Sequence, residues 1–133
     1  MSALTASPPA QPAPPGFHLG TIPVYGEAIL APMDGFSDLP FRSLCRSFGS
    51  ALSYTPFVNA MEVLARNPRT ERLLAFDEAE RPVVYQLFDS DEDRLLRAAL
   101  AVLAHRPDVL DINMGCSVRC VSGRGAGAGL LRD

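Results

Sequence analysis

The residues best suited to chemistry stand together near the end of the chain. Within residues 108–127, an apolar run from Val109 to Ile112 stops at Asn113, and Cys116 follows in a turn marked by glycine. A short apolar run bounded by turn signals predicts a buried strand. In α/β proteins, ligands bind and reactions occur just past the ends of such strands. The amide and the thiol are therefore candidates for a functional site.

A basic, glycine-rich loop follows this thiol and contains Arg119 and Arg124. The formal net charge of −3 does not suggest a nucleic-acid-binding protein, because such domains usually carry a clear excess of basic residues. A local basic patch can still act alone, and these two arginines are the candidates for one. Cys116 also has a structural interpretation as a small buried hydrophobe, although its Gly-Cys-Ser turn favours a functional role.

The cysteine content indicates a reducing compartment. The chain has 3 cysteines, Cys45, Cys116 and Cys120, and an odd number without a secretory signal argues against a disulfide framework. We therefore expect a cytoplasmic protein. No further cysteine or histidine lies near Cys116 and Cys120, so we predict no metal site. No apolar run reaches the ~18 residues of a membrane span, and we expect no membrane association.

Length and composition are those of one modest globular domain. The chain has 133 residues, of which 47% are hydrophobic and 20% are charged. Residues 1–16 are rich in proline and carry no charged side chain, which predicts a disordered tail. Residues 17–27 are typical of a short strand or hairpin, and residues 17–133 are the expected folded part.

Four short apolar runs predict strands, at residues 28–31, 51–55, 82–88 and 109–112. Helical spacing and capping signals alternate with these runs. The predicted helices run from Ser37 or Asp38 to Gly49, over residues 58–65 with a further turn or two at 70–76, and from Ser90 to Pro107. The inner face predicted for the last helix consists of Leu95, Leu96, Ala99, Val102 and Leu103. Strands and helices that alternate in this way predict a parallel sheet with both faces buried.

Each predicted strand ends in a polar or unusual group. These groups are Pro32, Met33 and Asp34 after the first strand, Thr55 after the second, Gln86 near the end of the third, and Asn113 with Cys116 after the fourth. The carboxyl ends of parallel strands meet at one edge, so all four strands direct groups toward one site. A barrel and a doubly wound sheet both fit this pattern, and the GxGxxG dinucleotide fingerprint is missing after the first strand.

Several motifs resemble the N-terminal part of the tRNA-dihydrouridine synthases. They are Leu30-Ala31-Pro32-Met33-Asp34-Gly35, Asp38-Leu39-Pro40-Phe41-Arg42, Val84-Tyr85-Gln86-Leu87-Phe88, Asp111-Ile112-Asn113-Met114-Gly115-Cys116, and Gly125-Ala126-Gly127 followed by Leu130-Leu131. Together they cover roughly residues 19–133 in the order and spacing of that family. The resemblance implies an FMN-binding (β/α)8 TIM barrel, of which this chain holds about the first four strands with three helical connections.

The resemblance also implies roles for individual residues. Pro32 and Met33 would lie against the flavin ring, Gln86 would hydrogen-bond to it, and Asn113 would place the target base. In the implied reaction NADPH reduces the flavin, the flavin transfers a hydride to C6 of uracil, and Cys116 protonates C5. Free thiols have a pKa of about 8.5 and are mostly protonated near neutral pH, which suits a proton donor. Arg119 and Arg124 would meet phosphates of the tRNA partner.

The chain departs from the family pattern at five positions. Ser117 stands where proline is usual, Arg119 where lysine is common, Pro56 where glutamate is common, Asp89 where glycine is usual, and Cys120 is an additional thiol. Oxidation could join Cys120 to Cys116 in a disulfide.

The length also differs, because a (β/α)8 barrel takes ~250 residues. We expect these 133 residues alone to be poorly soluble or to fold by self-association, and to bind FMN weakly. Two alternatives stay open: another FMN-dependent barrel reductase, such as a dihydropyrimidine or enoate reductase, and a non-catalytic or inactive fragment that binds RNA or a partner.

Overall fold

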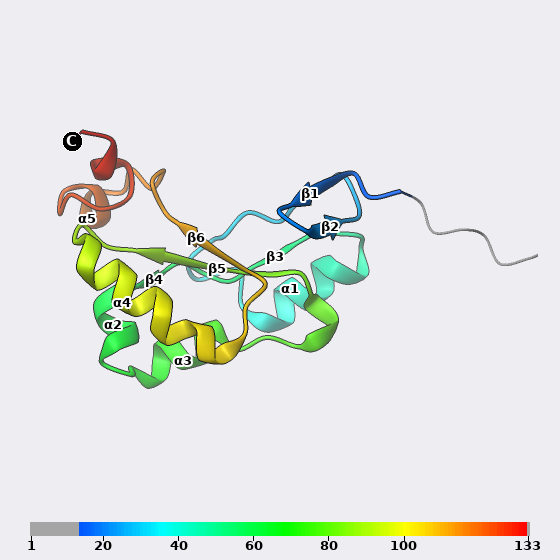
Figure 1. Cartoon of the computed structure of the whole chain (residues 1–133), viewed down its shortest axis with the longest axis horizontal. Coiled ribbons are helices and arrows are strands. Elements are labelled where there is room, and N and C mark those ends of the chain that lie inside the picture. Colours follow the sequence, from blue (N-terminus) through cyan, green and yellow to red (C-terminus); the bar gives the residue numbers. More distant parts are fainter. Residues whose placement is uncertain (1–13, 133) are drawn as a thin grey trace, which may run out of the picture.

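The computed structural model describes residues 14–132, which form a mixed α/β fold with a parallel sheet (Figure 1). The predicted disordered tail, residues 1–16, lies outside the described residues except for residues 14–16. None of the helices between residues 14 and 132 is long and apolar enough to cross a membrane.

The chain enters through the predicted hairpin. Strand β1 (Phe17–Leu19) pairs antiparallel with β2 (Ile22–Val24), and Gly20 supplies the positive φ of 59° at the turn. Val24 is fully buried in a small core with Ala51, Leu52 and Val84. The hairpin is therefore packed against the sheet and is part of the fold.

The first predicted strand, residues 28–31, is not a strand in the structure. The segment is tied to the next one by two hydrogen bonds, from Ala51 N–H to Ala28 O at 2.8 Å and from Leu30 N–H to Ser50 Oγ at 3.3 Å. A strand needs a continued ladder of main-chain hydrogen bonds, and here a serine hydroxyl takes one position of that ladder. Ile29 is 44% exposed, so the expectation of two buried faces is also wrong for this segment.

The other three predicted strands form one parallel sheet. Strands β3 (Ser53–Tyr54) and β4 (Val58–Asn59) pair with one edge of β5 (Val83–Phe88), near its start and at its end, and β6 (Val109–Ile112) pairs with the other edge. The predicted parallel arrangement is confirmed for these strands. Because all these strands run parallel, their carboxyl ends lie toward one edge of the sheet.

The first helices begin at side chains that cap them. In α1 (Leu39–Ser47) the Asp38 carboxylate accepts a hydrogen bond from Phe41 N–H at 3.1 Å, as one of the two predicted caps. The helix predicted from residue 58 begins later, as α2 (Ala60–Leu64), because the two residues before it pair with β5. It is followed by α3 (Pro68–Leu74) and by η1 (Glu78–Glu80).

The remaining helical segments precede and follow β6 in the chain. The N-cap of α4 (Glu92–Val102) is Asp91 rather than Ser90, since the Asp91 carboxylate accepts from Arg94 N–H at 2.8 Å. The turn η2 (Leu103–His105) then leads to β6. After β6 come α5 (Arg119–Ser122) and η3 (Gly127–Arg132).

The main core lies between the sheet and helices α2, α3 and α4, which cover one of its faces (Figure 1). Its buried residues are Val58, Ala60, Val63, Leu74, Val83, Tyr85, Leu87, Ala98 and Val102. The predicted inner face of α4 is correct for Leu95, Ala99 and Val102, but Leu96 and Leu103 are 59% and 50% exposed. The helix is rotated so that Ala98, whose small side chain permits close approach to α2 and β5, faces the core instead.

Candidate functional site

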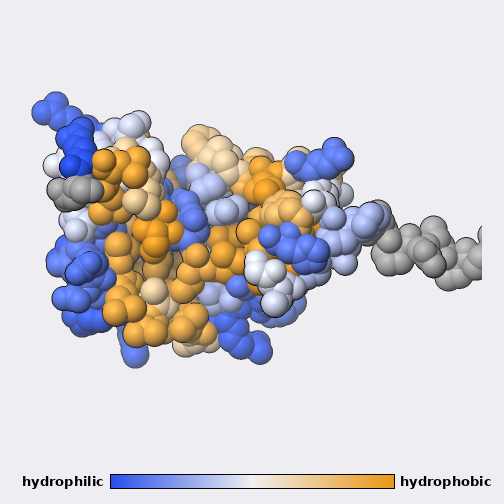
Figure 2. All heavy atoms as spheres, turned by 45° about the horizontal axis from the view of Figure 1, so that its top comes forward, coloured by the Kyte–Doolittle hydropathy of each residue, from blue (hydrophilic) through white to orange (hydrophobic). Residues whose placement is uncertain are grey.

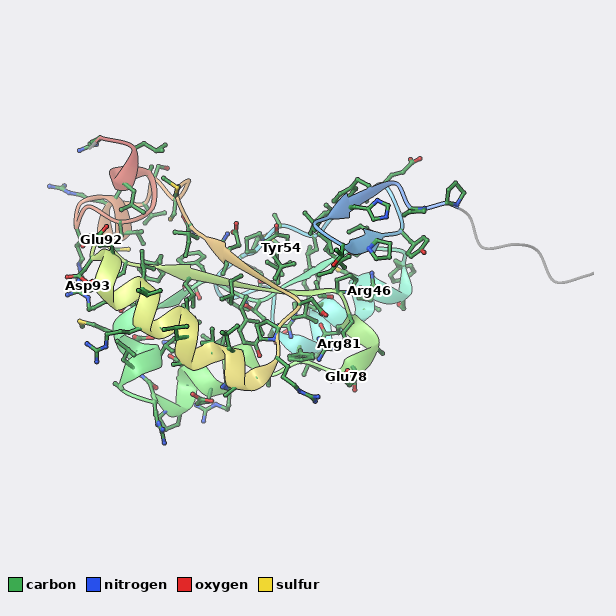
Figure 3. All side chains as sticks on the ribbon, in the orientation of Figure 1. Arg46, Tyr54, Glu78, Arg81, Glu92 and Asp93 are labelled. Carbon is green, nitrogen blue, oxygen red and sulfur yellow. The ribbon has the colours of Figure 1, made fainter. Side chains whose placement is uncertain are left out.

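Polar side chains line the face of the sheet turned away from the helices. Alternation along β5 sends Tyr85 and Leu87 into the helical core and Gln86 to the opposite face. Gln86 is level with Asp111 of β6, and its Nε2 donates to Asp111 Oδ2 at 2.5 Å. Tyr54 lies on the same face (Figure 3), and burial together with the Asp111 carboxylate raises the pKa of its phenol. Asp111 was not predicted as a site residue, although a carboxylate inside an apolar strand is a signal for one.

Asn113 connects this polar face to the turn that carries Cys116. The side chain is 8% exposed, and its Nδ2 donates to Gln86 Oε1 at 3.1 Å. Its Oδ1 accepts from the main-chain N–H groups of Gly115 at 3.2 Å and Cys116 at 2.9 Å. The same amide therefore orients Gln86 and holds the backbone that presents the thiol.

The glycine-rich loop packs directly on this turn. A Cβ added at Gly127, where φ is +57°, would lie 2.6 Å from Cys116 O and 2.9 Å from Val121 Cγ1. The next residue, Ala128, donates its N–H to Cys116 O at 3.0 Å. Glycine is thus required at this position for the loop to approach the cysteine closely.

Four predicted site residues line one pocket of about 470 Å³ at the carboxyl end of β5 and β6. They are Pro32, Gln86, Asn113 and Cys116. Phe57 also lines this pocket, together with Asp111, Ile112, Met114 and Gly115. Sequence reasoning missed Phe57, whose only signal was its place shortly after a predicted strand end.

The other predicted residues are placed differently. Met33 is 36% exposed and lines neither this pocket nor a larger neighbouring one, and its main chain forms a tight turn with Ser37. Arg119 is exposed on α5 and also lines neither pocket, whereas Arg124 lines the larger one. Thr55 is fully buried, and its hydroxyl has no hydrogen-bond partner within residues 14–132.

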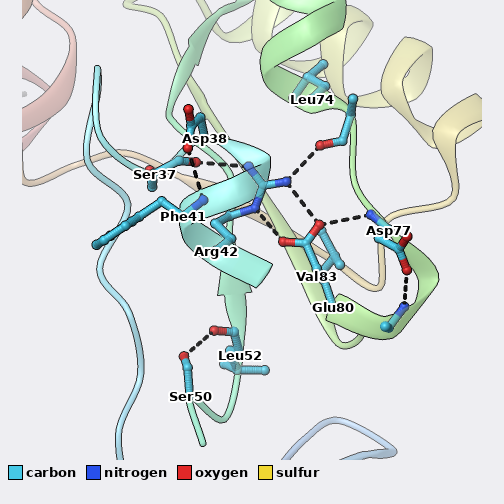
Figure 4. A network of polar contacts seen from close by, with 12 residues as sticks. Ser37, Asp38, Phe41, Arg42, Ser50, Leu52, Leu74, Asp77, Glu80 and Val83 are labelled. Carbon is cyan, nitrogen blue, oxygen red and sulfur yellow. Dashed lines mark hydrogen bonds and ion pairs between the residues drawn. The ribbon is translucent and has the colours of Figure 1, made fainter. Parts of the chain in front are cut away.

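A buried ion pair positions the segment that contributes Pro32. Arg42 of α1 and Glu80 of η1 are 0% and 1% exposed in their side chains and meet at 2.9 Å (Figure 4). Arg42 also donates to Ser37 O at 2.9 Å and to Ala75 O at 2.7 Å. Ser37 in turn hydrogen-bonds the main chain of Met33. Sequence reasoning assigned no role to this pair, because nothing local links positions 42 and 80.

A second set of ion pairs joins the amino ends of β5 and β6, opposite the pocket. Arg81 pairs with Glu78 at 2.6 Å and with Asp108 at 2.8 Å, and Asp108 also accepts from Val83 N–H at 2.7 Å. In Figure 3, Arg81 and Glu78 lie at the end of the molecule away from Glu92 and Asp93, which mark the start of α4. These contacts hold the register that places Gln86 beside Asp111.

The chain is similar in sequence to one family of known proteins. Residues 29–133 match a family model described as dihydrouridine synthase (Dus). The chain is 42% identical over 94 residues to a probable tRNA-dihydrouridine synthase of Aquifex aeolicus, covering 70% of this chain and 29% of that protein. It is 35% identical over 118 residues to probable tRNA-dihydrouridine synthase 1 of Synechocystis, covering 87% of this chain and 33% of the relative.

A third relative, tRNA-dihydrouridine synthase B of Pseudomonas aeruginosa, is 36% identical over 117 residues, which cover 87% of this chain and 35% of that protein. The chain thus spans about a third of the length of the curated relatives it matches. The match of the family model to residues 29–133, which include the whole pocket described above, shows that the chain belongs to the dihydrouridine synthase family.

Proposed function

We propose that this chain is the N-terminal part of the barrel of a flavin-dependent tRNA-dihydrouridine synthase, which reduces uridine to 5,6-dihydrouridine in tRNA. The observation that carries the proposal is the pocket in which Pro32, Gln86, Asn113 and Cys116 converge in a chain of this family. The parallel sheet, in which β5 lies between β6 and the pair β3 and β4, with helices on one face, supports residues 17–133 as the first part of a (β/α)8 barrel.

The lining of the pocket fits the ring of FMN better than its phosphate. Pro32 and Phe57 offer flat apolar surfaces, and the Gln86 amide carries donor and acceptor groups of the kind that a flavin ring edge requires. None of the residues lining this pocket is basic. We therefore assign Pro32 and Gln86 to the ring, with Met33 next to Pro32 in the chain, and assign no described residue to the phosphate.

The residues around the thiol suit proton donation to a pyrimidine. When bound, FMN reduced by NADPH supplies a hydride to C6 of the uracil ring. The Cys116 thiol then donates its proton to C5, so that one hydride and one proton complete the reduction of the C5–C6 double bond. Asn113 fixes the turn that carries the thiol, and its second Nδ2 hydrogen, which has no acceptor within residues 14–132, would be available to the base. The uridine must leave its stack to enter such a pocket.

The proposal is tested by replacing the thiol. In the full-length protein, we expect C116A to lose at least about a hundredfold in dihydrouridine formation on unmodified tRNA, because the proton donor is gone, while bound flavin is retained. The matched control is C45A, which removes a thiol that lines neither pocket and should reduce tRNA at the wild-type rate. Wild-type turnover by C116A would refute the assignment of the acid.

The absence of a basic residue from the lining of the flavin pocket favours one alternative. In that alternative, the 133-residue chain by itself binds RNA or a partner without catalysis. Flavin absorbance in the purified chain distinguishes the two. A stoichiometric flavin spectrum supports the enzyme, and a colourless chain that binds tRNA supports the non-catalytic alternative.

A further inference from the structure

We propose that the larger pocket beside Cys116 is a binding site for the RNA strand next to the target uridine. The site would bind one phosphodiester group of the RNA together with the base next to it. This inference rests on the proposed function, which supplies the RNA substrate, and adds a second site to it.

The pocket has a size suited to a ligand and a direct connection to the thiol. Its volume is about 720 Å³, within the range usual for ligand sites. Its walls come from the segments around α2, α3, the start of α4 and α5. Phe57 and Cys116 line both this pocket and the smaller one, so the two are adjacent at the thiol. A strand whose uridine occupies the smaller pocket would continue into the larger one.

Two arginines of this pocket are available for phosphate. Arg94 already forms an ion pair with Asp89 at 2.6 Å. The nearby Glu62 carboxylate already accepts a hydrogen bond from Thr70 at 3.0 Å. Within residues 14–132, the guanidinium groups of Arg69 and Arg124 have no ion pair or hydrogen bond. Arginine is well suited to phosphate, because its planar donors match phosphate oxygens.

An aromatic pair in the same pocket provides a surface for a base. The rings of Phe57 and Phe88 meet edge to face, with centroids 5.3 Å apart and planes at 78°. Both side chains are half-buried and line the pocket. Stacking of a base on an aromatic side chain is tolerant of base identity, as a position flanking the modified uridine requires. Asp34, also in the lining, can accept a hydrogen bond from a base or a ribose hydroxyl.

A nicotinamide dinucleotide offers the same chemistry, since it also carries phosphates and bases. Two features favour RNA. Arg69 and Arg124 are both exposed and come from separate elements, as expected for contacts along the rim with an extended polyanion. The pocket also adjoins the thiol that the target base must reach.

The test uses the full-length protein and combines R69Q, R124Q and the double variant with R97Q as the matched control. Arg97 is exposed on α4 and lines neither pocket. The measurements are the Kd for unmodified tRNA across a NaCl series, the KM values for tRNA and NADPH, and the bound flavin. We expect the double variant to bind tRNA at least about tenfold more weakly, with the log–log salt slope reduced by about 1 per arginine. The KM for NADPH and the flavin content should be unchanged, and R97Q should match the wild type.

Further variants distinguish a lost RNA contact from a loss of folding. R69K and R124K keep the charge, so they should restore most of the salt slope if phosphate contact is the cause. F88L should weaken tRNA binding without altering the salt slope, because it removes stacking and no charge.

The inference and the proposed function fail in different ways. Wild-type tRNA affinity in the double variant, with tRNA still reduced, would overturn the inference and leave the function standing. A raised KM for NADPH with an unchanged Kd for tRNA would assign the pocket to the dinucleotide, and this result would also overturn the inference. If the wild type forms no dihydrouridine, the function fails, and the tRNA affinities, measured without turnover, still decide the pocket.

Discussion

At the scale of single residues, the Asn113 side chain joins the strands of the pocket to the turn that carries Cys116. Its carbonyl oxygen accepts two main-chain N–H groups of the cysteine turn, and its amide nitrogen donates to Gln86. Gln86 donates onward to Asp111, so a chain of hydrogen bonds runs across β5 and β6 to Cys116. Because the amide is buried, each of these partners would otherwise stay unsatisfied.

This arrangement predicts different effects for two substitutions of Asn113. N113A leaves the N–H groups of the cysteine turn and the Oε1 of Gln86 without partners, and we expect a loss of about 1–3 kcal/mol in the free energy of unfolding. N113D keeps the acceptor for the turn but faces Gln86 Oε1 without a donor and adds a second carboxylate near Asp111. Its deficit should therefore shrink as the pH falls and protonation relieves the repulsion. Urea unfolding between pH 4 and pH 8 measures both, and a pH-independent deficit in N113D would contradict this account.

At the scale of elements, two charged contacts hold the helices that position the site. The buried Arg42–Glu80 pair ties α1 to η1 and, through Ser37, fixes the segment that carries Pro32. The Asp89 carboxylate lies just before α4, where it accepts from the N–H groups of Ser90 and Asp91 and pairs with Arg94. Asp89 thus has a structural role at a position where the family resemblance led us to expect glycine.

We predict strong coupling between Arg42 and Glu80. Either R42A or E80A leaves an uncompensated buried charge, at an expected loss of about 3–5 kcal/mol. The double variant should lose clearly less than the sum of the two, because the second substitution removes the charge stranded by the first. A double-mutant cycle in urea tests this, and additive losses would contradict it. The matched control is the exposed pair Glu78–Arg81, for which the single variant E78A should have little effect.

The Asp89–Arg94 pair predicts a pH-dependent contribution to stability. The hydrogen bond from Arg94 holds the pKa of Asp89 below its ordinary value of 3.8. A lowered pKa in the folded state means that the contribution is complete above pH 3.8 and is lost as the pH falls through the lower, folded-state value. D89N should therefore be less stable than the wild type near neutral pH, with the difference vanishing in acid. Thermal unfolding at several pH values measures this, and a D89N deficit that does not decrease as the pH falls below 3.8 would refute the assignment.

At the scale of the whole molecule, much apolar surface is exposed to solvent. Figure 2 shows hydrophobic residues gathered across the middle of the face that it draws. On α1 and at its C-cap, Leu44 and Phe48 are 53% and 84% exposed, and on α4 Leu96 and Leu100 are 59% and 60% exposed. Such surface is typical of a protein face that packs against further structure.

We therefore expect the 133-residue chain, expressed by itself, to self-associate. Sedimentation velocity should show a mean mass that rises with concentration, because association removes the exposed leucines from water. L96E combined with L100E should shift the distribution toward monomer, whereas the control R97E, which changes charge between these positions, should have a smaller effect. A monomer at every concentration tested would show the prediction to be wrong.

Local signals predicted the elements that depend on local structure. Residues 82–88 and 109–112 are nearly continuous apolar runs, and they form β5 and β6, whose carboxyl ends line the smaller pocket. Asp38 was a predicted cap and is one. Residues 28–31 have an equally apolar pattern, yet they form no strand, because strand formation depends on partners that the pattern does not specify.

Apolar runs and turn signals are local, so the types of functional group and the strand ends that carry them can be predicted from the sequence. Which of these groups meet depends on the folded chain. It brings Pro32 to Gln86 and Cys116, leaves Met33 and Arg119 outside the pockets, and adds Phe57 and Asp111. It also buries Arg42 against Glu80, 38 residues away. The physical reason is that hydrogen-bond and ion-pair partners are selected by the packing of distant segments, which no local pattern encodes.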